Sequence, residues 1–233
     1  DLAAPLRDTL YADGERPLQT LHHFAEGYLQ GFIETIHILP FYPYSSDDRF
    51  SVQDYYAVNP QVGTWDDVTA LSKGFGLMFD AVFNHMSAQS EWFQHFLDRK
   101  PGYQNLFMTA SPDSDLSEVT RPRQSPLLTP FQTSDGETIH VWTTFSADQV
   151  DFDVRDPSTL LRLLDVLLFY VSKGATMIRL DAIAFLWKEA GTTSIHLPQT
   201  HVVIQLMHAV LDAIAPKVNL ITETKVPQKE NVS

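Results

Sequence analysis

Apolar residues follow two alternating patterns along this chain, short unbroken runs and longer stripes with helical spacing. Each unbroken run is typical of a buried strand, and the runs cover 33–39, 77–83, 175–180 and 218–222. The stripes recur every three or four residues, which predicts helices over 17–30, 64–72, 157–173 and 203–215. Strand and helix in repeated order favour an α/β fold with a parallel sheet covered by helices.

Residues at the ends of these stripes support the helix predictions. Thr64 is followed three positions later by Asp67, which resembles a capping box with aspartate in place of glutamate. Asp156 is suited to cap the next helix, because the Pro157 that follows it fits a first helical turn. Gly174 then ends that helix.

The alternating pattern breaks between residues 86 and 150. Apart from a short helix predicted over 92–97, this region is rich in Pro, Ser, Asp and Thr, which is typical of a functional insertion. A complete (β/α)8 TIM barrel uses about 250 residues. Four strands and an insertion therefore predict a partial barrel, about strands two to five. We divide the chain into 1–85, the first part of the barrel, 86–150, an irregular loop-rich subdomain, and 151–233, the continuation of the barrel through its last strand.

Composition removes several classes of function. The formal charge of −13 disfavours nucleic acid and anionic membranes as partners, because both require a basic patch. The chain has no cysteine, which excludes disulfides, thiolate zinc sites and cysteine nucleophiles. No apolar run approaches the length of a membrane span, and the first residues lack the pattern of a secretion signal. We therefore expect a soluble, cytoplasmic protein.

Ionisable residues follow the predicted strands at their carboxyl ends, where parallel α/β folds place their active sites. Asp47 lies in the loop after the first strand, His85 just beyond the second, Asp181 after the third and Glu223 after the fourth. Taken singly, each has an ordinary structural interpretation. An Arg179-x-Asp181 pair on a strand, for example, is often an ion pair that only stabilises the fold.

The ordered set of motifs is more specific than any single residue. Asp80 to His85, Arg179-x-Asp181 and Glu223 after an apolar strand resemble three signature regions of glycoside hydrolase family 13, the α-amylase family. Further segments resemble the sucrose phosphorylase subfamily and, within it, the glucosylglycerate phosphorylase branch. They are 37–43, 50–55, 84–87, 103–107, 121–123, 148–151, 188–192, 197–201, 222–225 and 229–231.

The resemblance implies a retaining mechanism of α-glucosyl transfer. Asp181 would be the covalent nucleophile and Glu223 the general acid/base, a pair that needs carboxyl groups about 5–5.5 Å apart in unlike environments. Arg179, two residues before Asp181 on a strand, points to the same side and would keep the nucleophile anionic. The residues at sugar-binding positions would be Asp47, Phe50 and His85, together with Arg179.

The resemblance also concerns cofactors. It implies inorganic phosphate as a co-substrate and no cofactor. No residues have metal-ligand spacing, and Asn84 matches a calcium-ligand position in amylases that the subfamily does not use. The substrate would be a small carbohydrate, an α-glucoside such as sucrose or glucosylglycerate, converted to α-glucose 1-phosphate.

The chain departs from the family pattern in ways that leave alternatives open. It stops before the family's third carboxylate, and Arg49 and Lys225 stand where glycine and asparagine are usual. We expect a fragment with little activity of its own, whose exposed sheet edges favour a homodimer or other self-association. A hydrolase of the same family and a non-catalytic carbohydrate-binding or assembly module remain alternatives. The acceptor, whether fructose, fructose 6-phosphate, glycerate or glycerol, stays open.

Overall fold

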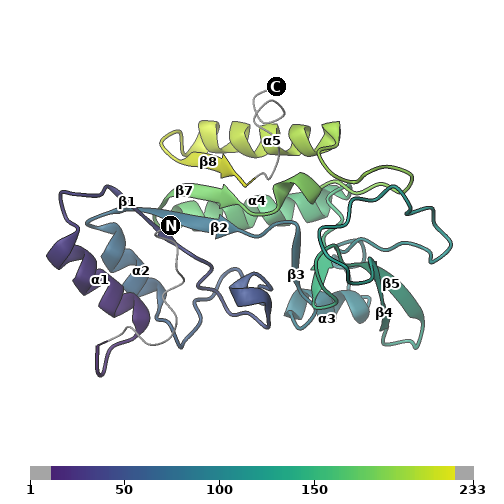
Figure 1. Ribbon diagram of the computed structural model, residues 1–233, viewed down its shortest axis with the longest axis horizontal. Coiled ribbons are helices and arrows are strands. Elements are labelled where there is room, and N and C mark those ends of the chain that lie inside the picture. Colours follow the sequence, from purple (N-terminus) through teal and green to yellow (C-terminus); the bar gives the residue numbers. More distant parts are fainter. Residues whose placement is uncertain (1–11, 224–233) are drawn as a thin grey trace.

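A parallel sheet forms the centre of the computed structural model, which describes residues 12–223 (Figure 1). The sheet has four strands in the order β1-β2-β7-β8. These strands are β1 (Thr35–Ile38), β2 (Gly76–Ala81), β7 (Ala175–Leu180) and β8 (Asn219–Thr222). All three neighbouring pairs are parallel. Each strand lies within or over one of the four runs predicted from the apolar pattern, so the predicted parallel sheet is confirmed.

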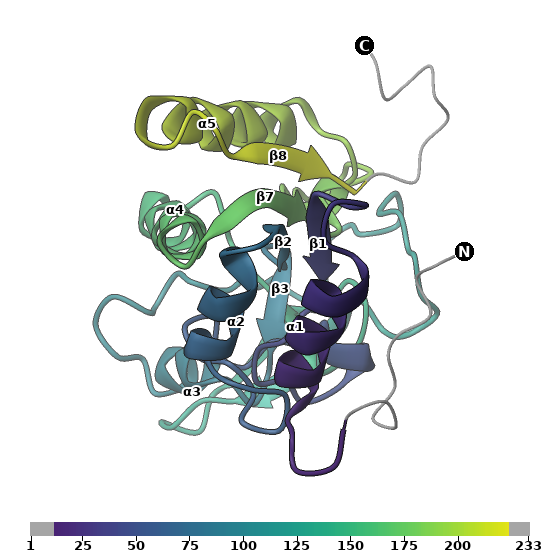
Figure 2. The ribbon, with the colours of Figure 1, turned by 90° about the vertical axis from the view of Figure 1, so that its left-hand side faces the viewer.

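One helix precedes each strand of the sheet along the chain. The four helices are α1 (Pro17–Tyr28), α2 (Trp65–Ser72), α4 (Pro157–Ser172) and α5 (Pro198–Ile214). Figure 2 shows that they follow the curve of the sheet from α1 at β1 to α5 at β8. The predicted capping is present, because the Thr64 side chain accepts from the backbone of Asp67 and that of Asp156 accepts from Ser158.

Two strand pairs and a short helix lie between β2 and α4. Strand β3 (His85–Ser87) pairs antiparallel with β6 (Gln149–Asp151), and β4 (Leu128–Gln132) pairs antiparallel with β5 (Thr138–Trp142). The short helix α3 (Glu91–Leu97) was predicted, whereas the strands were not. The β3–β6 pair has three residues on each side, too few to show a period of two, and Pro130 interrupts the pattern of β4.

The region 86–150 lies beside the carboxyl ends of the sheet strands (Figure 1). Part of it packs on the main core, since Phe93 and Phe107 belong to the same apolar cluster as Phe152 and the strands of the sheet. Another part has a small cluster of its own, made of Met108, Val119, Leu127 and Trp142. The division of the chain at 86 and 150 remains an interpretation.

Exposed apolar side chains lie on the elements at the two ends of the sheet. Phe24 and Tyr28 lie on α1 and Phe32 and Ile33 in the loop before β1, whereas Val202, Leu206 and Ile214 lie on α5 and Ile221 in β8. Large exposed apolar groups along an unpaired sheet edge favour contact with further protein. Among residues 12–223, no helix combines the length and apolar character that a bilayer crossing requires.

Candidate active site

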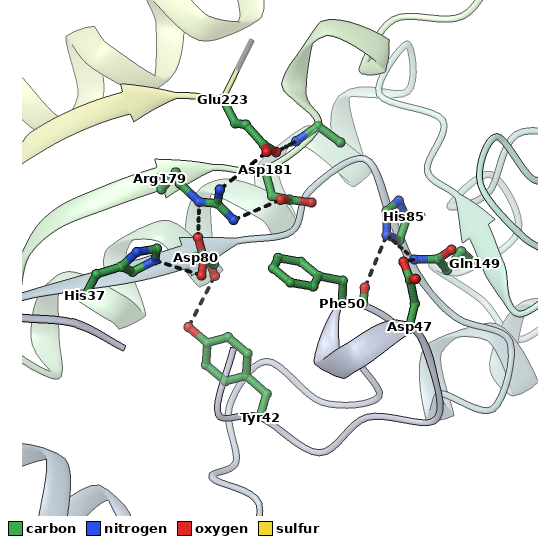
Figure 3. A network of polar contacts seen from close by, with 11 residues as sticks. His37, Tyr42, Asp47, Phe50, Asp80, His85, Gln149, Arg179, Asp181 and Glu223 are labelled. Carbon is green, nitrogen blue, oxygen red and sulfur yellow. Dashed lines mark hydrogen bonds and ion pairs between the residues drawn. The ribbon is translucent and has the colours of Figure 1, made fainter. Parts of the chain in front are cut away.

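Asp181 and Glu223 leave the sheet from the ends of neighbouring strands. Asp181 directly follows β7 and its backbone N–H donates to the carbonyl of Ala81, at a distance of 3.1 Å. Glu223 directly follows β8 and donates in the same way to Leu180, at 3.0 Å. Because parallel strands end at the same edge, both carboxyl groups point into one site (Figure 3). Asp181 is buried, with 7% of its surface exposed, whereas 34% of the Glu223 side chain is exposed.

Arg179 connects three carboxyl groups in this site. Its Nη2 atom donates to Oδ1 of Asp181 at 3.1 Å, and its Nη1 atom lies 3.5 Å from Oε1 of Glu223. Its Nε atom donates to Oδ1 of Asp80, which is fully buried at the end of β2 and is also 3.0 Å from Nε2 of His37. The predicted orientation of Arg179 towards the side of Asp181 is confirmed.

Burial and the neighbouring Glu223 carboxyl together raise the pKa of Asp181 to about 8, against the opposing effect of Arg179. The expectation that Arg179 keeps Asp181 anionic is therefore wrong for the free site. The physical reason is that one guanidinium charge is divided among three carboxyl groups and lies nearest to Asp80. Near neutral pH, Asp181 and Glu223 consequently hold one proton between them.

The Glu223 carboxyl lies next to the segment that carries Asp181. Its Oε2 atom accepts from the backbone N–H of Ala182, the residue after Asp181, at 3.3 Å. Retaining enzymes hold two such carboxyl groups about 5–5.5 Å apart. The Glu223 side chain is the more exposed of the two, at 34% against 10% for Asp181.

His85 lies in a second part of the site and is buried, with 2% of its surface exposed. Lys188 can only donate hydrogen bonds, so the Asn84 atom 2.9 Å from its ammonium is the amide oxygen. The Asn84 amide nitrogen therefore faces Nδ1 of His85 at 3.2 Å, which makes Nδ1 an acceptor. The Nε2 atom lies 3.2 Å from the carbonyl of Phe50 and 3.0 Å from the amide nitrogen of Gln149. Burial lowers the pKa of His85 and favours the neutral ring.

Asp47 and Phe50 come from one loop that contains a short 3-10 helix, Asp47–Arg49. The Oδ2 atom of Asp47 accepts from Nε2 of Gln149 at 2.9 Å, and its Oδ1 atom lies 3.5 Å from Nη2 of Arg123. The Phe50 ring lies 5.8 Å from the Arg179 guanidinium, so it borders both parts of the site (Figure 3). Arg49, which replaces a glycine of the family pattern, has a left-handed φ of 87°.

The structure thus brings all six predicted site residues to the carboxyl end of the sheet (Figure 3). It also adds residues to which the sequence reasoning gave no role, namely Asp80, Gln149 and Lys188. Gln149 and Asp151 flank the buried Val150 in strand β6, so a polar-apolar-polar triplet was the available signal. Lys188 gave no periodic signal because it lies in a loop. Lys225 and the segment 229–231 lie outside the described residues.

The Asn84 position does not fit a calcium ion. Its amide oxygen is engaged by the buried ammonium of Lys188, whose Nζ atom also lies 3.3 Å from Oδ2 of Asp151. A divalent cation there would be repelled by that fixed positive charge. Within residues 12–223, no group of three or more His, Cys, Asp or Glu side chains is arranged to hold a metal ion.

Comparison with known proteins places this geometry among carbohydrate-active enzymes. The family model "Alpha amylase, catalytic domain" matches residues 27–233. Glucosylglycerate phosphorylase of Spirochaeta thermophila is 55% identical over 220 residues, which cover 94% of this chain and 37% of that protein. Sucrose phosphorylase of Agrobacterium vitis is 34% identical over 192 residues, 78% of this chain and 39% of that protein. The chain thus spans about two-fifths of the length of these curated relatives.

Comparison with solved structures also finds members of this group of enzymes among the matches. The crystal structure of sucrose 6F-phosphate phosphorylase from Thermoanaerobacter thermosaccharolyticum matches with a TM-score of 0.84 at 28% identity, over 92% of this chain and 46% of that one. A "Family GH13_31 enzyme" matches with a TM-score of 0.82 at 19% identity, over 96% and 46%, and supports the fold alone. These neighbours confirm the predicted α/β fold as part of a (β/α)8 barrel.

Proposed function

This chain belongs to the α-amylase family, and from that membership we propose that it supplies the nucleophile and acid/base side of a retaining α-glucosyl transfer. The observation that carries the proposal is the position of Asp181 and Glu223. They lie at adjacent strand ends and share Arg179, and a phenyl ring and a neutral histidine complete the site. Two carboxyl groups that share one proton can act as nucleophile and acid.

In the first step, an oxygen of Asp181 bonds to the anomeric carbon of the glucosyl group. The bond from that carbon to the departing oxygen breaks, and Glu223 gives its proton to the departing oxygen. This step requires Asp181 to be ionised and Glu223 to be protonated. In the free site burial raises the pKa of Asp181, so binding of the sugar must leave Asp181 ionised and the proton on Glu223.

In the second step, an oxygen of inorganic phosphate attacks the same carbon and the ester to Asp181 breaks. Glu223 accepts the proton that the phosphate releases, and the product is α-glucose 1-phosphate. Phosphate is an anion in a site that still holds the carboxylates of Asp47, Asp80 and Glu223, so it needs a nearby cation. Arg123, which is exposed and borders Asp47, is the arginine that we assign to this contact.

The glucosyl group itself would be held by the second part of the site. The Oδ atoms of Asp47 and the imidazole of His85 are suited to bond sugar hydroxyl groups, and the ring of Phe50 is suited to pack on the pyranose face. Arg179 would hold the Asp181 carboxylate in place as the ester forms and breaks.

Phosphorolysis of a glucosylglycerate-like or sucrose-like α-glucoside is our first candidate, because the relatives named as such phosphorylases are 50–55% and 34% identical. Hydrolysis by the same residues is the second candidate, and it differs in whether water reaches the glucosyl ester. The reaction needs no cofactor beyond phosphate as co-substrate. A charged sugar phosphate does not cross membranes, which favours a cytoplasmic enzyme.

The activity test needs a complete barrel, because the chain spans about two-fifths of its relatives. We suggest a chimera in which this chain replaces the matching segment of the Spirochaeta thermophila glucosylglycerate phosphorylase. It is incubated with glucosylglycerate or sucrose, with and without phosphate, and glucose 1-phosphate is measured against free glucose. We expect phosphate-dependent glucose 1-phosphate from the chimera and negligible turnover by the chain alone. Free glucose at the same rate with or without phosphate would establish hydrolysis instead.

The exposed apolar edges also support a proposal about assembly. Side chains such as Phe32, in the loop before β1, and Ile221, in β8, are open to water in the isolated chain. We propose that the chain alone forms homodimers or larger assemblies through these edges. A sedimentation experiment over a range of concentrations tests this, and a monomer at all concentrations would contradict it.

A further inference from the structure

The loop that carries Asp47 and Phe50 holds an unfavourable backbone conformation. Three consecutive residues have left-handed φ values, 53° at Asp47, 48° at Asp48 and 87° at Arg49. Residues with a Cβ atom rarely adopt this conformation, and a run of three persists only when the surroundings hold it. Something outside these three residues must therefore keep the loop in place.

The side chain of Asp148, directly before β6, is the point on which the loop converges. Three hydroxyl groups donate to its Oδ2 atom, those of Ser45 at 2.5 Å, Ser46 at 2.5 Å and Ser51 at 2.7 Å. The three serines flank the left-handed residues on both sides. Ser87, from strand β3, adds a longer contact of 3.4 Å to Oδ1 and a 2.6 Å contact to the Ser45 hydroxyl.

These bonds cross from one part of the chain to another that is about 100 residues away. The backbone bonds of the loop, in contrast, are local. Phe50 donates to the carbonyl of Asp47 at 2.9 Å, and Ser51 donates to that of Ser46 at 3.3 Å. Local bonds close the turn, and single contacts from Phe50 to His85 and from Asp47 to Gln149 reach the rest of the site. The bonds to Asp148 hold the residues on both sides of the left-handed run. Hydrogen bonds to an ionised carboxylate are about twice as strong as neutral ones, so a carboxylate suits this anchoring position.

We propose that Asp148 is a positioning residue for sugar binding, which holds the loop 45–51 in its strained form and so places Asp47 and Phe50 against the glucosyl group. The inference rests on the proposed function, because it takes the site to be a sugar site. It goes further in assigning a role to a residue that does not touch the sugar. If Asp148 only stabilised the fold, its removal would have the same effect whether or not residue 49 is strained. If Asp148 holds the strained loop, relieving the strain at Arg49 should offset the loss of Asp148.

Backbone strain can be separated from all other effects by a pair of substitutions at one position. Arg49→Gly removes the guanidinium and the Cβ atom and so relieves the left-handed strain. Arg49→Ala removes the guanidinium and keeps the Cβ atom, which makes it the matched control. If Asp148 restrains a strained loop, Arg49→Gly compensates for the loss of Asp148 and Arg49→Ala does not.

The first measurement is amide hydrogen exchange of Phe50 and Ser51 in the chain without sugar. We expect Asp148→Asn to speed this exchange about tenfold, the effect of exchanging charged for neutral hydrogen bonds. Added Arg49→Gly should restore protection, while Arg49→Ala should not. Asp113→Asn, which removes an exposed carboxylate in the same region, should change nothing. If Asp148→Asn unfolds the chain, Ser46→Ala takes its place with a smaller effect in the same direction.

The second measurement is turnover of the chimera. Asp148→Asn should raise KM for the glucosyl donor about tenfold and change kcat by less than about threefold, because it acts on binding groups. Arg49→Gly should lower KM again. Wild-type exchange rates in Asp148→Asn, or equal compensation by Gly and Ala, would overturn the role of Asp148. An inactive wild-type chimera would instead contradict the proposed function, and the exchange experiment would still decide the role of Asp148.

Discussion

The two parts of the candidate site are built in different ways. The binding part, formed by Asp47, Phe50 and His85, is tied to strand β6 through Gln149 and to Lys188 through Asn84. The acid part, formed by Asp181 and Glu223, lies at the ends of β7 and of the edge strand β8, and Arg179 is divided between its carboxyl groups and Asp80. These bonds brace the binding part, although its Asp47 is as open to water as Glu223, with 35% and 34% of their side chains exposed.

This difference matches the demands on each part. Groups that recognise a sugar gain from being fixed in advance, because no ordering is then lost on binding. Groups that exchange a proton and a covalent bond must change charge during the reaction. A shared guanidinium and a shared proton allow either carboxyl group to be ionised. The following predictions change one part and leave the other in place.

The largest effect should come from removing the nucleophile in the chimera. Asp181→Asn leaves the binding part untouched but cannot form the ester, so transfer should fall about 10⁴-fold or more. Glu223→Gln should cost about 10²- to 10⁴-fold. Initial rates of glucose 1-phosphate release measure both. An Asp181→Asn chimera that keeps a tenth of the rate would rule out the assigned role.

Removing Lys188, which braces the binding part, should have a smaller effect. That effect should appear in the free energy of unfolding. Lys188→Met leaves Asp151 without its ammonium partner in a fully buried position, which should lower the free energy of unfolding by about 3–5 kcal/mol. Urea denaturation of the chain measures this. Lys217→Met, an exposed lysine, serves as the control and should change stability by less than about 0.5 kcal/mol. Equal effects of the two substitutions would contradict the bracing role.

The acid part should make stability depend on pH. The pKa of Asp181 is raised from 3.8 to about 8 in the folded chain. Between these values the folded chain keeps a proton that the unfolded chain has released, so stability falls as pH rises, by at most about 1.4 kcal/mol per unit. Asp181→Asn should flatten that slope. Urea denaturation at pH 5 and pH 8 compares the two proteins, and parallel pH dependences would show that the proton lies elsewhere.

The smallest effect should come from the residue that borders both parts. Phe50→Leu keeps the apolar contact but removes the ring face, which should weaken sugar binding by about 1 kcal/mol, or about fivefold. The KM of the chimera for its glucosyl donor measures this. A larger loss in kcat than in KM would assign Phe50 to the acid part instead.

The sequence was sufficient to predict those parts of the structure that depend on neighbouring residues in the chain. The four parallel strands and their helices follow from apolar periodicity, and the caps at Thr64 and Asp156 follow from residue type. Strands β3 and β6 escaped prediction because each has three residues and pairs with a partner about 60 positions away. A still longer sequence separation hid Asp148, since the hydroxyl groups that it holds lie about 100 residues earlier.

The candidate residues were found through family motifs, but their electrostatics could not be read from them. The sequence places Arg179 beside Asp181, and that proximity suggests an anionic nucleophile. It does not show that Asp80 takes the nearest part of the guanidinium or that burial and Glu223 raise the pKa of Asp181. A pKa depends on all neighbours at once, and those neighbours come from three different strands.

The most direct test of the assignment of Asp181 and Glu223 is to trap the covalent intermediate. A Glu223→Gln chimera is mixed with α-glucosyl fluoride, which needs no acid to release fluoride, and is then digested and examined by peptide mass spectrometry. We predict that the peptide containing Asp181 gains the mass of one glucosyl residue and that added phosphate releases it as α-glucose 1-phosphate. A glucosyl group on any other residue, or consumption of the fluoride by the Asp181→Asn variant at an undiminished rate, would contradict the assignment.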